Sequence, residues 1–150
     1  MTKKKSIKSK EKANNEQKYI VGSINFKHLI NLKKEIRDGL KKSRTNLVRA
    51  ALIKLFELAY DQGWKTLQKV LMEFYSINTI GSRDTFREAA KANLIDDCER
   101  WLDFIKDRSR TIYTYNHSIA DQIIDNLEDF ITELEILIQN LDELGEKLAT

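Results

Sequence analysis

Proline is absent from all 150 residues, and this absence limits what the chain can fold into more than any other feature of the sequence. Proline removes a backbone hydrogen bond and kinks or ends helices, so a chain without it can form long continuous ones. Glycine, the next strongest helix breaker, occurs only five times. A chain of this length is usually one domain with a core of its own. We therefore expect long helices packed around one core.

Apolar residues recur at helical spacing in five segments, and this period predicts five helices. Their approximate ranges are 23–42, 46–75, 82–93, 96–107 and 118–148. In the last segment the apolar residues alternate at spacings of four and three, which favours a seam packed inside a bundle. The expected caps of the last three helices are Ser82, Asp96 and Ser118. The predicted fold class is all-α, an up-and-down bundle of about five helices.

The predicted helix over 46–75 has a broad apolar surface, so we expect it to be buried on more than one side. The core residues expected one turn apart within it are Phe56, Tyr60 and Trp64. Charged residues with the same spacing either line an interface or form a ladder of ion pairs, which we favour; they are Glu57, Asp61 and Lys65. Gly63 costs about 1 kcal/mol relative to alanine in a helix and is expected to permit close approach of another helix.

Charge is distributed unevenly along the chain. Residues 1–18 hold seven lysines and two glutamates with almost no apolar side chain, which predicts a disordered Lys-rich tail before a single helical domain over 19–150. Residues 19–115 hold 18 basic and 12 acidic residues, whereas 116–150 hold one lysine and nine acids. Such asymmetry is typical of solvated faces, and it also suits a polyanion such as RNA bound on one side only.

The sequence also limits the compartment and the cofactors. Cys98 is the single cysteine, which excludes an intramolecular disulfide and suits a reducing compartment. No apolar run approaches the roughly 18 residues that a membrane span needs, and the charged start lacks the apolar stretch of a signal peptide. We therefore expect a cytoplasmic protein without membrane contact. The spacings of metal ligands, of glycine-rich phosphate loops and of Ser/His/Asp catalysis do not occur, so no cofactor or metal is expected.

A compact polar cluster, Arg-Ser-Arg-Thr-Ile-Tyr-Thr-Tyr, occupies 108–115 between the last two predicted helices. Arg108 has the planar fork that pairs with phosphate oxygens, although an arginine here would also stabilise a helix C-terminus. Tyr115 either protrudes from the junction or packs between the helix ends with its hydroxyl bonded to backbone. The cluster is the strongest candidate site in the sequence.

Several segments resemble a known family when taken in order. They are Leu-Phe-Glu-Leu-Ala-Tyr at 55–60, Trp-Lys-Thr-Leu at 64–67, Ser-Arg-Asp at 82–84, Phe-Arg-Glu-Ala at 86–89, Leu-Ile-Asp-Asp at 94–97, Trp-Leu at 101–102, Asp-Arg at 107–108 and Tyr115. Together they resemble the nucleotidyltransferase substrate-binding protein family of the HEPN superfamily, whose best-studied branch is the HepT toxin of HepT–MntA modules. The resemblance spans about 26–144.

The resemblance implies an up-and-down helical bundle that forms a homodimer and has a minimal nucleotidyltransferase of the MntA type as its partner. In the HepT branch the bundle is a metal-independent ribonuclease toxin built on the motif Arg-x4-His-x-Tyr. The nucleotidyltransferase is the antitoxin there, and it silences HepT by transferring AMP onto the motif tyrosine. On this chain Arg108 takes the arginine position, Tyr113 stands where the histidine would be, and Tyr115 is the modified tyrosine.

Tyr113 is a poor base, because a phenol of pKa near 10 is ionised in about one molecule in a thousand at pH 7. The motif therefore favours a partner subunit that accepts AMP at Tyr115. The alternative is a HEPN-type ribonuclease that acts on RNA through Arg108, or through Arg110 and His117, which fit the looser spacing Arg-x4–6-His of some HEPN proteins. His117 would otherwise be an exposed residue beside a helix cap. Whether the chain is an enzyme stays open.

Overall fold

The computed structural model describes residues 19–149, so the predicted tail over 1–18 lies outside the described residues. Within these residues the elements are a short hairpin, six α-helices and one 3-10 turn. In chain order they are β1 (Ile20–Val21), β2 (Ile24–Asn25), α2 (Lys27–Leu40), α3 (Asn46–Tyr75), α4 (Gly81–Lys91), α5 (Cys98–Arg110), η1 (Thr111–Tyr113), α6 (His117–Asp125) and α7 (Leu127–Ala149). The predicted all-α fold class is confirmed. Within 19–149 no helix has the length and apolar character needed to cross a membrane.

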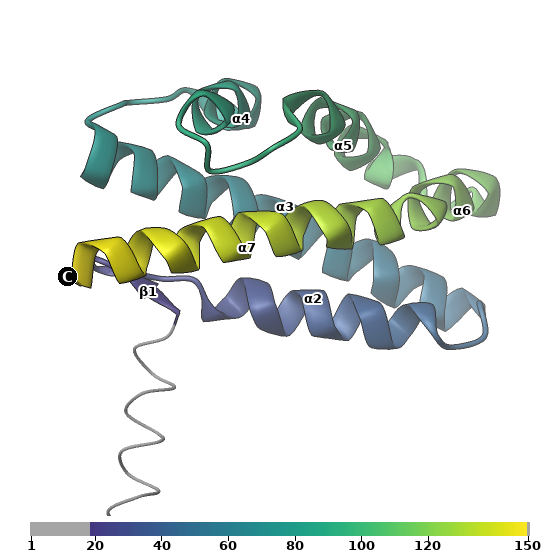
Figure 1. The fold of residues 1–150 in the computed structure, drawn as a ribbon. Coiled ribbons are helices and arrows are strands. Elements are labelled where there is room, and N and C mark those ends of the chain that lie inside the picture. Colours follow the sequence, from purple (N-terminus) through teal and green to yellow (C-terminus); the bar gives the residue numbers. More distant parts are fainter. Residues whose placement is uncertain (1–18, 150) are drawn as a thin grey trace, which may run out of the picture.

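The long helices α3 and α7 run through the middle of the bundle (Figure 1). Helix α2 packs against both of them on one side, and α4 and α5 pack on the other. Helix α6 contacts α3 near the first turns of α3, where Arg49 Nε donates to Asp121 Oδ1 at 2.9 Å. Helix α3 therefore touches neighbours on several sides, as its broad apolar surface predicts.

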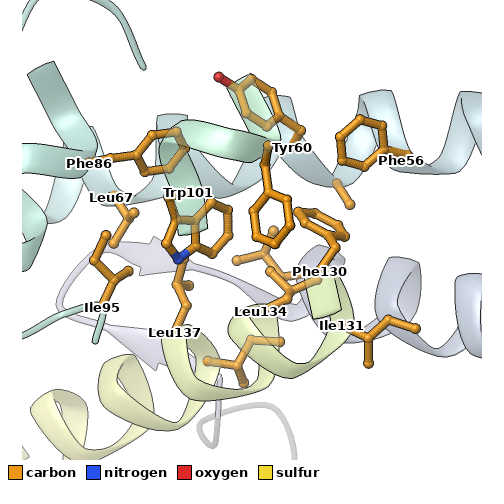
Figure 2. Close-up of a cluster of buried hydrophobic side chains, with 14 of the residues drawn as sticks. Phe56, Tyr60, Leu67, Phe86, Ile95, Trp101, Phe130, Ile131, Leu134 and Leu137 are labelled. Carbon is orange, nitrogen blue, oxygen red and sulfur yellow. The ribbon is translucent and has the colours of Figure 1, made fainter. Parts of the chain in front are cut away.

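Aromatic side chains from four helices meet at the centre of the core (Figure 2). Phe86 on α4 stacks on Trp101 on α5, with ring centroids 4.8 Å apart. Phe130 on α7 packs edge to face against Phe56 on α3 and against Phe104 on α5, at 5.0 and 5.2 Å. Such edge contacts add about 0.5–1.5 kcal/mol each beyond the area that they bury. This cluster holds α4 and α5 against the central pair of helices.

The predicted core stripe of α3 is confirmed in part. Phe56 and Tyr60 are buried, whereas Trp64 lies at the edge of the core and is only partly buried. The apolar seam of α7 packs inside the bundle as predicted, since its buried members include Leu134, Leu137 and Leu141.

The segment predicted as one helix over 118–148 is divided into α6 and α7 at Asn126. The Asn126 side chain donates from Nδ2 to Oδ2 of Asp107 on α5, at 2.9 Å. The sequence did not predict this break, because the apolar period continues across Asn126. Its consequence is that α6 can pack on α3 while α7 follows the core.

The hairpin of β1 and β2 was not predicted, and the segment from Ser23 to Phe26 precedes the first helix instead of belonging to it. The two strands are antiparallel, with Val21 opposite Ile24. Ser23 attaches the turn to α3, because its Oγ donates to Glu73 Oε2 at 3.0 Å. On the other side α7 approaches closely at Gly145, where an added Cβ would lie 2.9 Å from the carbonyl oxygen of Ile20. Strands of two residues are too short for a periodic signal.

Three helix starts differ from the predicted caps by one or two residues. Asp97 caps α5 instead of Asp96, because its Oδ1 accepts from Arg100 N at 3.0 Å. Asn116 caps α6 instead of Ser118. Helix α4 begins at Gly81, and Ser82 accepts a hydrogen bond from the Tyr60 hydroxyl at 2.8 Å instead of capping.

Gly63 does not mark a close helix approach, and that prediction is wrong. A Cβ added at Gly63 would meet no neighbouring atom within 4 Å, although the residue is buried. The close approach between α2 and α3 occurs at Gly39, where an added Cβ would lie 2.8 Å from Cδ2 of Leu52.

Candidate functional site

Arg108 lies in the last turn of α5, and its side chain reaches across to α3. Its Nε donates to Asp61 Oδ1 at 3.2 Å and its Nη2 donates to Asp61 Oδ2 at 3.1 Å. Nη1 donates to Thr111 Oγ1 at 3.0 Å and lies 3.7 Å from Glu57 Oε2. Arg108 is thus held by a bidentate carboxylate, a second carboxylate and a hydroxyl. We call these four residues the Arg108 cluster.

The Arg108 cluster corrects the ion-pair ladder predicted along α3. Glu57 and Asp61 pair with Arg108 on a neighbouring helix, and Lys65 instead places its Nζ 5.9 Å from the ring centroid of Trp64. The hydrogen bonds to Asp61 raise the pKa of Arg108 above its ordinary value, against partial burial that lowers it. Any phosphate that binds Arg108 must therefore compete with two carboxylates for the guanidinium.

Tyr60 and Ser82 adjoin the Arg108 cluster from α3 and α4. The Tyr60 ring belongs to the aromatic core, while its hydroxyl points away from the other labelled rings (Figure 2) and donates to Ser82 Oγ. Burial raises the pKa of the Tyr60 hydroxyl above its ordinary value, and the charge of Asp61 adds to this. The hydrogen bond with Ser82 and the charges of Arg108 and Arg83 offset part of the increase. The first turn of α4 and the end of α5 therefore contact α3 at two adjacent residues, Tyr60 and Asp61.

The two tyrosines of the motif project from the junction between α5 and α6. Tyr113 ends η1 with 47% of its surface exposed, and Tyr115 in the following turn is 82% exposed. The backbone of this turn is held locally, because Thr114 Oγ1 donates to Thr111 O at 2.8 Å and Asn116 N donates to Tyr113 O at 3.0 Å. Of the two alternatives for Tyr115, the structure has the protruding side chain and not the packed one.

Arg110 and His117, the looser candidate pair, lie on either side of the same turn. Arg110 faces α6, where its Nη2 donates to Gln122 Oε1, and its Nη1 lies 3.8 Å from Asp107 Oδ1. His117 is the exposed first residue of α6. Within 19–149 no side-chain hydrogen bond joins the two residues, so a shared site would need rearrangement of Arg110.

Asp107 is an acidic residue of this region that the sequence did not single out as a site. It is 6% exposed, and Asn126 donates a hydrogen bond to it at 2.9 Å. Burial raises the pKa of Asp107, while Asn126 and Arg110 lower it. No group of three or more histidine, cysteine, aspartate or glutamate residues in the described part of the chain could hold a metal ion.

Asp61, Glu57 and Thr111 are the members of the cluster that sequence reasoning missed as partners of Arg108. Asp61 and Arg108 are 47 positions apart, and no spacing rule connects residues on helices that are not adjacent in sequence. A cue was present, because two acids one turn apart on a largely buried helix need a cation from elsewhere.

The fold identifies the class of protein. A crystal structure of a protein from Thermus thermophilus is similar, with a TM-score of 0.70 and 25% identity over 75% of this chain and 98% of that one. A Haemophilus influenzae structure, described as the fold of a substrate-binding domain of a nucleotidyltransferase, has a TM-score of 0.69 and 23% identity, covering 78% of this chain and 98% of that one. The chain therefore has the same small helical fold as these two structures.

The chain belongs to the family described as nucleotidyltransferase substrate binding protein like, whose model matches residues 10–143. This confirms the family resemblance seen in the sequence. A curated relative, the probable ribonuclease HepT of Haemophilus influenzae, is 30% identical over 97 residues. That alignment covers 61% of this chain and 66% of the relative, just under two thirds of its length.

Proposed function

We propose that this protein is the partner subunit of a minimal nucleotidyltransferase in a toxin–antitoxin-type module, and that Tyr115 accepts AMP from that enzyme. The observation that carries the proposal is the 82% exposure of Tyr115 at the motif position where the family resemblance implies modification. Membership in the family supports a nucleotidyltransferase as the partner. The cytoplasm, where ATP is available and Cys98 stays reduced, is the proposed compartment.

The chemistry requires a hydroxyl that an external active site can reach. The phenol oxygen of Tyr115 attacks the α-phosphorus of ATP, a new O–P bond forms, and the bond between the α-phosphorus and the bridging oxygen breaks. Pyrophosphate leaves, and the phenol proton passes to a base of the nucleotidyltransferase or to water. ATP and its metal ions are supplied by the nucleotidyltransferase. This chain contributes the Tyr115 hydroxyl, which the active site of the nucleotidyltransferase can reach without unfolding of the bundle.

The test is an intact mass measurement after incubation with the partner minimal nucleotidyltransferase, ATP and Mg²⁺. We expect one or more AMP adducts on the wild type and none on Tyr115→Phe. The matched control is Tyr113→Phe, two residues away and also exposed, which should still accept AMP. An unmodified wild type, or an adduct that persists in Tyr115→Phe, would contradict the assignment.

We also propose that the chain forms a homodimer, as the family resemblance implies. Light scattering coupled to size exclusion should give a mass near twice the 17.6 kDa of one chain. A mass of one chain across the micromolar range would rule the homodimer out.

A ribonuclease is the second candidate, favoured by the similarity to the probable ribonuclease HepT. Two observations weigh against it: Tyr113 occupies the place of the motif base, and the Arg108 cluster engages the cation. Incubation of AMP-free protein with RNA tests this alternative. Cleavage that is lost in Arg108→Gln, or in His117→Ala, would establish a nuclease, whereas intact RNA would favour the partner subunit alone.

A further inference from the structure

The arginines of this chain divide into two groups. The sequence contains eight, and all lie within 19–149. Six form ion pairs with carboxylates: Arg37, Arg44, Arg49, Arg100, Arg108 and Arg110. Arg83 and Arg87 are exposed and form no ion pair or side-chain hydrogen bond with the residues that the structure describes. We call these two the α4 arginine pair.

The acids of α4 form no ion pair with these arginines, because their carboxylates have other partners. Asp84 Oδ2 accepts from the backbone N–H of Ile80 at 2.9 Å, and Glu88 Oε1 lies 3.2 Å from Lys91 Nζ. Arg83 and Arg87 are four residues apart, so both side chains leave the same face of the helix about 6 Å apart along its axis. Neither guanidinium of the pair is therefore bound by a carboxylate among the described residues, although Asp84 and Glu88 keep negative charge on the same helix.

The pair extends from the candidate site. Ser82, which precedes Arg83, accepts the hydrogen bond of Tyr60, and the charges of Arg83 and Arg108 both act on that hydroxyl. Arg87 lies one helical turn beyond Arg83 along α4. A chain of phosphates that passes the end of α5 would meet Arg83 first and Arg87 next.

We propose that the α4 arginine pair binds the phosphodiester backbone of a single-stranded nucleic acid lying across α4 toward the α5–α6 junction. The planar guanidinium fork matches phosphate oxygens, and two unpaired forks one turn apart can contact successive phosphates. Between Gly81 and Lys91 helix α4 exposes no large apolar side chain, and the exposed Ile80 lies at its N-terminal edge, whereas protein interfaces usually have apolar or aromatic anchors at their centre. The surface therefore fits a polyanion better than a protein partner.

The inference goes beyond the proposed function and is independent of it. Nucleic-acid binding by α4 requires no modification of Tyr115. Tyr115→Phe should lose its AMP adduct and still bind nucleic acid through α4, so the failure of either proposal can be recognised without the other.

Fluorescence anisotropy with a labelled single-stranded oligouridylate tests the proposal on the full chain. Arg83→Ala/Arg87→Ala should raise Kd about tenfold or more and reduce the slope of log Kd against log salt by about 1.4, since each phosphate contact on a single strand contributes about 0.7. Both side chains are exposed and alanine favours helices, so the variant should fold. Thermal melting verifies this.

The matched control is Lys34→Ala/Lys41→Ala, which also removes two exposed positive charges, from α2 and its C-terminal cap. It should change Kd less than about threefold. Equal loss in the two variants would indicate general charge attraction, including that of the lysines in 1–18, and would overturn the site. An unchanged Kd in the α4 variant would also overturn it, as would loss of nucleotidyltransferase binding with RNA binding intact.

A labelled oligothymidylate of the same length separates RNA from DNA. Equal, variant-sensitive binding of both would support backbone phosphates as the ligand without use of the sugar hydroxyl. Phenylglyoxal, which modifies accessible guanidinium groups, then locates the contact by mass spectrometry. Protection of the peptide containing Arg83 and Arg87 by oligouridylate would support the proposal, and equal modification with and without it would refute it.

Discussion

Arg108 on α5 binds Asp61 on α3 through two parallel hydrogen bonds, 3.2 Å from Nε to Oδ1 and 3.1 Å from Nη2 to Oδ2. This bidentate contact joins the end of α5 to the middle of the central helix. It also occupies the guanidinium that the motif would use for phosphate. The same contact therefore contributes to the fold and limits the chemistry of the motif.

The contact should contribute measurably to stability. Both side chains are about two thirds buried, with 29% and 35% exposed, so solvent screens the pair only partly. We expect a double-mutant cycle of Asp61→Asn and Arg108→Gln, followed by urea unfolding, to give a coupling free energy of about 1 kcal/mol. Asp103→Asn, on the exposed face of α5, is the control. Strictly additive effects of the two changes would show that the pair contributes nothing.

Two helix glycines should respond to alanine in opposite directions. Gly63→Ala should raise the free energy of unfolding by about 0.5–1 kcal/mol, because alanine favours the helix and its Cβ meets nothing within 4 Å. Gly145→Ala should lower it by about 1 kcal/mol or more, because its Cβ would lie 2.9 Å from the backbone oxygen of Ile20. Denaturant unfolding of the two variants tests this prediction. A change of the same sign in the free energy of unfolding of both variants would contradict the packing described.

The buried carboxyl of Asp107 should make stability fall as pH rises. Burial raises its pKa above the ordinary 3.8, so the folded state binds this proton more tightly than the unfolded state does. The contribution is complete below the unfolded pKa and is lost as pH rises through the folded pKa. Asp107→Asn, whose amide oxygen can still accept from Asn126, should therefore gain stability relative to wild type as pH rises from below the ordinary pKa of 3.8 through the raised folded pKa. Unfolding measured at several pH values tests this, and a constant difference would argue against it.

Asp121 should show the opposite pH dependence. The hydrogen bond from Arg49 lowers the pKa of Asp121, with further lowering by the charge of Arg44. Its contribution is present above the unfolded pKa and is lost as pH falls through the folded pKa. Asp121→Asn should thus be less stable than wild type at neutral pH, and the difference should shrink in acid and in high salt. A difference that grows on acidification would mean that the contact of α6 with α3 does not depend on this charge.

Much of the fold follows from local patterns. The period of the apolar residues is a property of neighbouring positions, so it located the long helices α3 and α7 and the inward face of α7. It failed where structure depends on distant residues. The two-residue strands are held by Glu73 and by the approach of α7 at Gly145, and the break at Asn126 is stabilised by Asp107.

The candidate site was located by sequence and altered by structure. The motif residues could be named because Arg108, Tyr113 and Tyr115 lie within eight positions, and the resemblance gave them roles. Their surroundings could not be predicted, because the partners of Arg108 come from α3 and from η1. The exposure of Tyr115 was one of two alternatives that only the path of the turn could separate.

By itself the sequence determined the all-helical fold class, the family and the position of the motif, because each depends on residue types and their spacing along the chain. Only the tertiary structure decided which charges are satisfied. An arginine in a sequence carries the same charge at every position, but the packing of α5 on α3 gives Arg108 two carboxylates, whereas the outward face of α4 gives Arg83 and Arg87 none among the described residues. Electrostatic pairing depends on distances of a few ångströms between helices, and those distances exist only after the core has packed.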